Sequence, residues 1–283
     1  MAAMSNDPHN VISVDTPRRI LVVVQRSNGD VYLSSPLIEG LYRAYGCPQI
    51  DLLVNCDTVA IAATLPHVSE ILQFSYKAGG KGGQTGELLV RIARRYDLSV
   101  NLTASDRSVL FALAASKKSI SAVEDDRRKS WWKRLSLAAC YDFDSGAHIV
   151  ENNTKALDLL GIGSGRPVVA ANHSLSAAES VYRMLDERGI TEFIIFHPGA
   201  QYEYKVYPEK LRIDLLERLS TLGLPIIVTG SKSTVDMAIK GSLPELPNVH
   251  DFIGETSIDE LIALSDRSLA YIGADTLNMH IAA

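Results

Sequence analysis

The chain has 283 residues, of which 46% are hydrophobic and 22% charged, a composition that is ordinary for a globular protein. Its formal net charge of −5 argues against nucleic-acid binding over the whole surface, although it allows a local basic patch. No apolar run approaches the ~20 residues that a bilayer span requires. The N-terminal stretch also lacks the pattern of a signal peptide, so we expect a cytoplasmic protein.

Short apolar runs alternate with helical patterns along the first half of the chain. The apolar runs at 19–24, 49–55 and 96–102 predict strands. Apolar residues at helical spacing predict helices over 35–46 and 106–116, the first with Pro36 near its start. This order of strand and helix predicts a mainly parallel sheet that is covered on both faces.

The same alternation restarts in the second half. The stretches 192–200, 224–233 and 268–276 each predict a strand followed by a loop, and helices are predicted over 174–189, 208–223 and 256–266. We expect capping boxes at Ser176 with Glu179 and at Ser257 with Glu260, and a helix stop at Gly189. The chain ends in "MHIAA", where another helix pattern begins, so we expect a sheet that lacks its last strand.

Two glycine-rich stretches resemble nucleotide-binding loops but lack their context. "GGKGGQTGE" (79–87) has no Ser or Thr after Lys81, which a P-loop needs, and therefore predicts a flexible surface loop. "GIGSG" (161–165) follows a helix pattern and not a strand, so it predicts a helix stop and a linker between two domains.

Three other loops each follow a predicted strand, and ligands of open α/β sheets bind where such strands end. "QRSNGD" ends in Asp30, which could be either a catalytic carboxylate or a helix N-cap. "HPGA" with Lys205 offers backbone N–H groups and one cation to an anion, although an exposed turn lysine is the alternative. In "GADTLNMH", Asp275 and Thr276 could instead cap a helix, and His280 could be a core histidine.

Taken together, these motifs resemble glycosyltransferase family 9, the heptosyltransferases of lipopolysaccharide core assembly. The motifs are "GD-x-x-L-x-x-P" near residue 30, "HPGA" before "K-x-[aromatic]-P", and "ADTLNMHIAA" beside the family's "ND-S-G-P-M-H-[LI]-A-A". The resemblance covers nearly all residues after about 17. It implies an α/β GT-B fold, in which two Rossmann-like parallel-sheet domains face each other across a cleft. We accordingly expect an N-terminal arm (1–16), an acceptor domain (17–165) and an incomplete nucleotide-sugar domain (166–283).

The resemblance also implies an activity and its residues. An inverting transferase would move a heptose from ADP-heptose, or a related nucleotide-diphosphate sugar, to a lipid-linked anionic oligosaccharide, with Asp30 as general base. No metal and no cofactor besides the nucleotide sugar are expected, because helix N-termini and a lysine would neutralise the diphosphate. The residues expected to bind the donor are Gly199, Ala200, Lys205, Gly230, Asp275, Thr276, Leu277 and His280.

Three residues depart from the family pattern. Leu277 stands where Gly is common and Asn278 where Pro is common, while Tyr207 replaces a Trp. Because a Leu side chain resists positive φ, we expect either a different donor sugar or a rearranged loop.

A basic stretch, residues 117–135, surrounds Trp131 and Trp132. It predicts either a solvated loop or a basic lip that meets an anionic acceptor or the inner membrane leaflet. The residues expected to bind the acceptor are Asn28, Gly29, Lys117, Lys118, Arg127 and Arg128. Two other functions stay open: an epimerase or hydrolase of nucleotide sugars on the same scaffold, and a non-catalytic sugar-binding protein.

Overall fold

The computed structural model describes residues 11–75, 83–163, 167–200 and 203–283. The chain divides into two compact units, residues 1–170 and 171–283, whereas the expected boundary followed residue 165. Residues 1–10 of the expected N-terminal arm lie outside the described part. The rest of the arm lies against unit 1, because Ile12 N donates to Leu159 O at 2.8 Å. The expected loss of a final strand stays a prediction.

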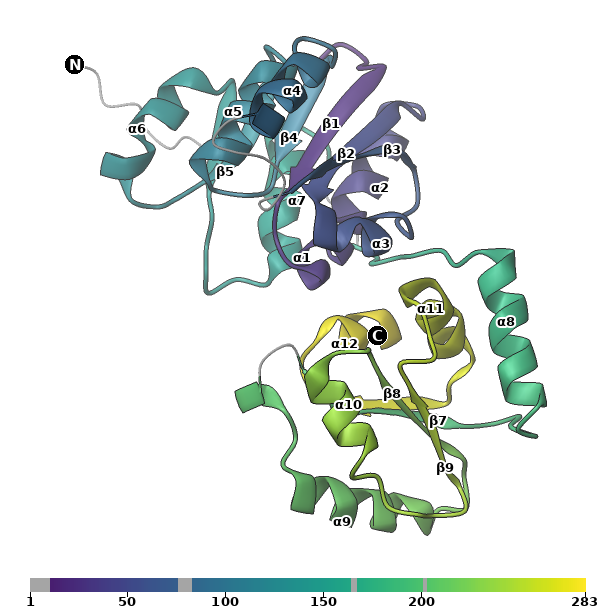
Figure 1. Ribbon diagram of the computed structural model, residues 1–283. Helices are drawn as coiled ribbons and strands as arrows, with labels where there is room; N and C mark the ends of the chain where they lie inside the picture. The colour runs from purple at the N-terminus through teal and green to yellow at the C-terminus, as the bar shows by residue number, and fades with distance from the viewer. Residues whose placement is uncertain (1–10, 76–82, 164–166, 201–202) are drawn as a thin grey trace. The chain divides into compact units, whose positions relative to one another are not determined.

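Unit 1 is built on a six-stranded sheet in the order β3-β2-β1-β4-β5-β6, with every neighbouring pair parallel (Figure 1). The strands are β1 (Arg19–Val24), β2 (Gln49–Asn55), β3 (Val68–Phe74), β4 (Leu98–Asn101), β5 (Ser119–Val123) and β6 (Ala139–Asp142). The helices are α1 (Asn28–Tyr32), α2 (Ser35–Ala44), α3 (Val59–Ala62), α4 (Gly83–Ile92), α5 (Asp106–Ala115), α6 (Arg127–Ser136) and α7 (Ile149–Leu159), with a 3-10 turn η1 (Cys56–Thr58).

Unit 2 is built on a four-stranded parallel sheet in the order β10-β7-β8-β9 (Figure 1). Its strands are β7 (Ile194–His197), β8 (Ile226–Gly230), β9 (Val249–Ile253) and β10 (Ala270–Gly273). Its helices are α8 (Leu175–Asp186), α9 (Glu209–Ser220), α10 (Thr234–Lys240), α11 (Ile258–Arg267) and α12 (Leu277–Ala282), with a 3-10 turn η2 (Glu203–Lys205).

The core of unit 2 follows from the two-residue period of its strands. Ile195 and Ile227 pack with α8 and α11 on one face of the sheet. Ile194, Phe196 and Val228 pack with α9 and α10 on the other. Alternate residues of a strand point to opposite faces, so helices must cover both faces to bury them. The predicted class, two parallel α/β domains, is confirmed.

Most of the predicted strands and helices are present, including the Ser257–Glu260 capping box. The box predicted at Ser176 is wrong, because Ser174 caps α8 and accepts a hydrogen bond from Ala177 N at 3.1 Å. The carboxylate that supports this cap comes from another helix: Asp259 accepts from Ser174 Oγ at 2.7 Å. The N-cap therefore lies two residues before the predicted Ser176, and it is supported by a tertiary contact.

Two predicted loops are partly wrong. Residues 117–135 contain β5 and most of α6. Strand β5 reads as polar in the sequence, but Ser119 and Ser121 are buried, and the Ser121 hydroxyl accepts from Asn101 Nδ2 at 2.8 Å. In the predicted loop 79–87, residues 79–82 lie outside the described part, and α4 begins at Gly83.

Within the described residues, the structure contains no helix that is both long and apolar enough to cross a membrane.

Candidate active site

Asp30 lies just beyond the carboxyl end of β1, the strand paired with β2 and β4 in the middle of the unit 1 sheet. The expected N-cap role is wrong, since Ser27 is the N-cap of α1 and Asp30 is the third helical residue. The two form a capping box in which Asp30 Oδ2 accepts from Ser27 N at 3.3 Å and from Ser27 Oγ at 2.7 Å. The sequence "SNGD" folds this way because both side chains satisfy N–H groups at a helix start.

The second oxygen of Asp30 faces a cation. Arg26 Nε lies 3.1 Å from Asp30 Oδ1, and the Arg26 guanidinium also stacks 4.8 Å from the centre of the Phe143 ring. The Asp30 side chain keeps 19% of its surface exposed, so a ligand can still reach it. The geometry thus gives a fixed, accessible carboxylate with a guanidinium beside it. Sequence reasoning missed Arg26, whose only signal was its i,i+4 spacing from Asp30.

The residues beside Asp30 leave hydrogen-bonding capacity unused. Asn28 and Gly29 form the first turn of α1, and Asn28 Oδ1 is buried without a hydrogen-bond partner among the described residues. A buried acceptor without a donor costs ~1–3 kcal/mol. A hydroxyl group or a water molecule at Asn28 would remove that cost, which fits the expected role of this residue in acceptor binding.

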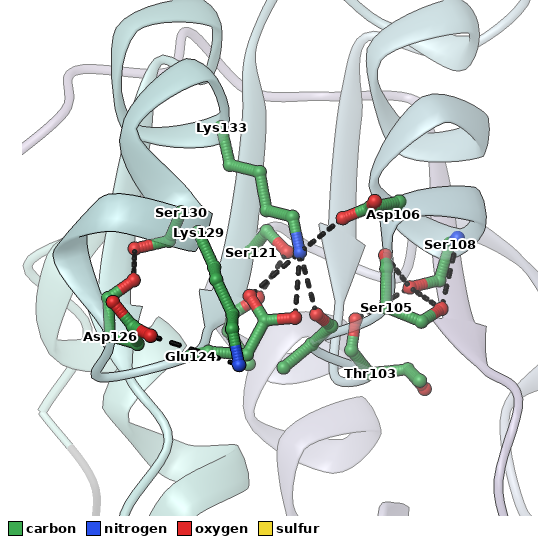
Figure 2. A network of polar contacts seen from close by, with 12 residues as sticks. Thr103, Ser105, Asp106, Ser108, Ser121, Glu124, Asp126, Lys129, Ser130 and Lys133 are labelled. Carbon is green, nitrogen blue, oxygen red and sulfur yellow. Dashed lines mark hydrogen bonds and ion pairs between the residues drawn. The ribbon is translucent and has the colours of Figure 1, made fainter.

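Lys133 joins the loops that follow β4 and β5 at the same edge of the sheet (Figure 2). Its side chain on α6 is fully buried, and Nζ donates to Ala104 O at 2.9 Å and to Glu124 at 2.7 Å. It also pairs with Asp106 Oδ1 at 2.7 Å. This ammonium is enclosed by acceptors and is therefore structural, so it does not belong to a solvated basic surface.

The basic stretch predicted as one acceptor surface is split by β5. Arg127 and Arg128 begin α6, exposed at the carboxyl edge where Asp30 lies. Lys117 and Lys118 precede β5 and lie at the opposite edge of the sheet. At ~3.3 Å per residue the strand separates the two pairs by about 20 Å. The structure therefore does not bring Lys117 and Lys118 to the Asp30 site.

In unit 2, the loops after β10, β7 and β8 meet because β7 pairs with both other strands. The loop after β7 carries Gly199, which is buried, and Ala200, which is half-buried. The loop turns back, since Tyr207 N donates to Pro198 O at 3.4 Å. Lys205 is exposed two residues earlier and makes no hydrogen bond or ion pair with a described residue. Within the described part of the chain, this ammonium is therefore unpaired, two residues before the point where the loop turns back.

Gly199 and Gly230 both pack against one buried carboxylate, that of Asp236 on α10. A Cβ atom at Gly199 would overlap Asp236 Oδ1, and one at Gly230 would lie 3.2 Å from Asp236 Cγ. Asp236 Oδ2 in turn accepts from Ser231 N at 2.7 Å and from Ser231 Oγ at 2.5 Å. A Cβ atom at either position would therefore crowd the Asp236 side chain, most of all at Gly199.

The loop after β10 holds the remaining expected donor residues. Thr276 is the N-cap of α12, as the capping alternative predicted, but its side chain makes no capping hydrogen bond. Asp275 is exposed, and its Oδ1 lies 4.0 Å from His280 Nε2. Leu277 begins α12; the described non-glycine residues with positive φ are Cys47, His67 and Arg94. Leu277 therefore does not adopt a positive φ, and whether the donor sugar differs stays a prediction.

Asn278, the other departure from the family pattern, makes a contact that a proline could not. Its Nδ2 lies 2.8 Å from Nδ1 of the buried His197, and the Thr229 hydroxyl lies 3.0 Å from the same nitrogen. Burial lowers the pKa of His197, although the carboxylate of Asp236 opposes this shift. A neutral imidazole thus connects β7, β8 and α12 beneath the loops.

A tyrosine lies beside the same loop. Burial raises the pKa of Tyr271 to about 12, and the adjacent Thr276 hydroxyl opposes this shift. Among the residues that the structure describes, no three His, Cys, Asp or Glu side chains gather closely enough to hold a metal ion.

Comparison with known proteins places these sites in a family. The family model of glycosyltransferase family 9 (heptosyltransferase) matches residues 88–283. The chain belongs to this family. It is therefore a glycosyltransferase of the heptosyltransferase type, and the predicted family is confirmed.

Three individual matches agree with this assignment. Lipopolysaccharide heptosyltransferase 3 of Escherichia coli (strain K12) is 27% identical over 269 residues, which are 91% of this chain and 77% of the relative. The crystal structure of the glycosyl transferase family 9 from Veillonella parvula DSM 2008 has a TM-score of 0.83 at 18% identity, over 96% and 79% of the two chains. E. coli heptosyltransferase WaaC with ADP-2-deoxy-2-fluoro heptose has a TM-score of 0.74 at 16% identity, over 93% and 85%.

Proposed function

We propose that this glycosyltransferase moves a heptose from ADP-heptose to a sugar hydroxyl of the lipopolysaccharide core, with inversion and without a metal ion. The observation that carries the proposal is the fixed and accessible carboxylate of Asp30 in a chain of glycosyltransferase family 9. The name of the relative, lipopolysaccharide heptosyltransferase 3, supports the acceptor class. The ADP-heptose analogue bound to a protein of the same fold supports the donor class.

In the proposed step, Asp30 takes the proton of the acceptor hydroxyl while the oxygen of that hydroxyl bonds to the anomeric carbon. The bond from that carbon to the diphosphate oxygen breaks, and ADP leaves with the electron pair. A single displacement inverts the anomeric centre. A positioned general base typically contributes ~10²–10⁴-fold to the rate. Arg26, whose Nε lies 3.1 Å from Asp30 Oδ1, keeps the carboxylate oriented.

The donor would lie on the loops of unit 2. Lys205 would neutralise the diphosphate, and the backbone N–H groups at Gly199 and Ala200 would donate to its oxygens. Asp275, Thr276 and Leu277 would border the sugar, with Gly230 beneath the nucleotide and His280 in a supporting role. At the acceptor, Asn28 would bind a hydroxyl group, while Arg127 and Arg128 would meet its anionic groups. Location in the cytoplasm and contact with the inner leaflet stay predictions.

Asp30→Asn tests the base directly. We expect heptose transfer to fall by ~10²-fold or more, because an amide cannot accept the proton, while the affinity for ADP stays unchanged. Transfer is measured with ADP-heptose and a core oligosaccharide acceptor, and ADP affinity by calorimetry. The matched control is Asp158→Asn, an exposed carboxylate on α7, which should transfer at the wild-type rate. Equal turnover in Asp30→Asn would remove Asp30 from the chemistry.

Lys205→Met tests the donor site. The ammonium has no described protein partner, so its loss should leave stability unchanged and raise the dissociation constant for ADP by about tenfold, about 1.4 kcal/mol. The control is Lys210→Met on α9, which is also exposed. ADP affinity that stays the same in Lys205→Met would place the diphosphate elsewhere.

Two incubations, one without acceptor and one with it, separate the remaining functions. A transferase leaves ADP-heptose intact without acceptor, an epimerase or hydrolase changes it, and a non-catalytic protein shows no transfer even when the acceptor is supplied.

A further inference from the structure

A second basic site lies at the edge of the unit 1 sheet opposite to Asp30. A hollow of about 710 Å³ opens there, beside the segment that leads into β1 and the turns that precede β4 and β5. Its charged lining residues are Arg18, Arg94, Lys117, Lys118, Asp15 and Asp97. Four cations thus face two carboxylates in a chain whose net charge is −5.

None of the four cations forms an ion pair with a carboxylate among the described residues. The side chains of Arg18 and Lys117 have no described hydrogen-bond partner at all. Lys118 Nζ and Arg94 Nη1 donate only to backbone oxygens, of Ser13 at 3.2 Å and Leu113 at 3.0 Å. Like charges that line one hollow repel each other, and each lacks the partner that would offset this repulsion.

The two carboxylates neutralise the four cations of the hollow only in part. Asp97 Oδ2 accepts from the backbone N–H groups of Arg18 at 2.8 Å and Arg19 at 3.0 Å, so this oxygen is engaged by the chain itself. Asp15 is exposed.

The backbone that carries two of the four cations is held in place. Arg94 has φ +52°, a conformation that costs of order 1 kcal/mol for a residue other than glycine. Its N–H donates to Ala114 O at 2.9 Å, which anchors it to the end of α5. The N–H of Lys118 donates to the buried Ser116 hydroxyl at 3.0 Å, which fixes the turn before β5. Guanidinium and ammonium groups around an open hollow are the donors that phosphate oxygens bind.

We propose that this hollow binds the phosphate group of an anionic ligand, away from the catalytic edge. The ligand can be a free phosphate compound or the headgroup of a phospholipid, since both present the same oxygens. The proposal does not depend on the transferase reaction.

The test compares two double variants of equal charge in the full chain. Arg18→Gln with Lys117→Gln removes two cations of the hollow, and Arg183→Gln with Lys210→Gln removes one Arg and one Lys that are exposed in unit 2. Inorganic pyrophosphate is titrated with ADP present and absent, and amide hydrogen exchange locates the protected residues. Flotation with phosphatidylcholine vesicles, with and without phosphatidylglycerol, tests the lipid source.

We expect pyrophosphate to protect 94–97 and 116–118 in the wild type and the control, and the hollow variant to bind there about tenfold more weakly. Binding of vesicles that contain phosphatidylglycerol, lost in the hollow variant alone, would identify a headgroup; protection by pyrophosphate without vesicle binding would identify a free phosphate. The proposal is overturned if the wild type shows neither protection by pyrophosphate nor vesicle binding. It is also overturned if the hollow variant binds as tightly as the wild type, or if the control loses as much binding as the hollow variant.

Discussion

Asn278 departs from the family pattern, and its side chain contacts His197 at the end of β7. Its amide and the Thr229 hydroxyl both lie within 3.0 Å of Nδ1 of His197. Because these three residues come from different segments, one imidazole restrains the loops after β10, β7 and β8 together. A proline at 278 could occupy the first turn of α12 but would lack the side-chain amide. The restraint therefore depends on the asparagine that this chain has where the family commonly has proline.

Asn278→Leu should loosen the loops without changing the volume much. We expect a loss of ~1–3 kcal/mol in the free energy of unfolding of unit 2, because buried polar atoms lose their partner, and weaker ADP binding. Thr229→Val removes the other contact to the same nitrogen, so the two effects should be non-additive by more than ~0.5 kcal/mol. Purely additive effects, measured by urea unfolding, would show that His197 does not couple the two segments.

At the scale of elements, α6 is anchored to the unit 1 sheet by Lys133. This buried ammonium contacts Ala104 O, Glu124 and Asp106, which lie at the ends of β4 and β5. Arg134, the next residue, pairs with Asp142 at the end of β6 and donates to Glu124 O at 3.1 Å. The helix thereby joins the ends of three neighbouring strands.

Lys133→Met should release that anchor. Removing one partner of a buried charge pair costs ~3–5 kcal/mol when the other stays buried. Here Glu124 is 39% and Asp106 71% exposed, so both can rehydrate and we expect about 2 kcal/mol. Both tryptophans of the chain, Trp131 and Trp132, lie on α6, so their fluorescence reports this unfolding directly. The control is Lys129→Met, on the same helix and 79% exposed, which should change stability little. A Lys133→Met variant as stable as this control would show that Lys133 does not anchor α6.

The elements that the sequence predicts well are those whose own residues carry the signal. Strand β1 is apolar after Arg19, and the sequence of α11 with its N-cap contains both residues of the capping box. Strand β5 escaped prediction because its buried Ser121 hydroxyl is satisfied by Asn101 and by backbone, partners that only the folded sheet supplies. The candidate site follows the same rule. Asp30 is marked by its motif, whereas Arg26, Asp236 and the Asn278–His197 contact depend on tertiary packing.

At the scale of the whole molecule, the histidines with a lowered pKa lie in unit 2, whereas tyrosines with a raised pKa lie in both units. In unit 2, burial lowers the pKa of His197, and burial together with the positive charge of Arg188 lowers the pKa of His250. In unit 1, burial raises the pKa of Tyr96 and Tyr141. Acid and alkali should therefore act through different groups, with acid acting on unit 2 through its histidines.

The acid side gives the sharper test. A histidine whose pKa is lower in the folded state than its ordinary value of 6.5 contributes stability above that value and loses it as the pH falls through the folded value. Unit 2 should thus unfold at a lower temperature at pH 5.5 than at pH 7.5, since at pH 5.5 its histidines bind more protons in the unfolded chain than in the folded unit. Circular dichroism follows both units, whereas tryptophan fluorescence follows unit 1, so the two signals separate the transitions. In His197→Gln the acid shift should shrink; a shift of the same size in that variant would assign the acid response to other groups.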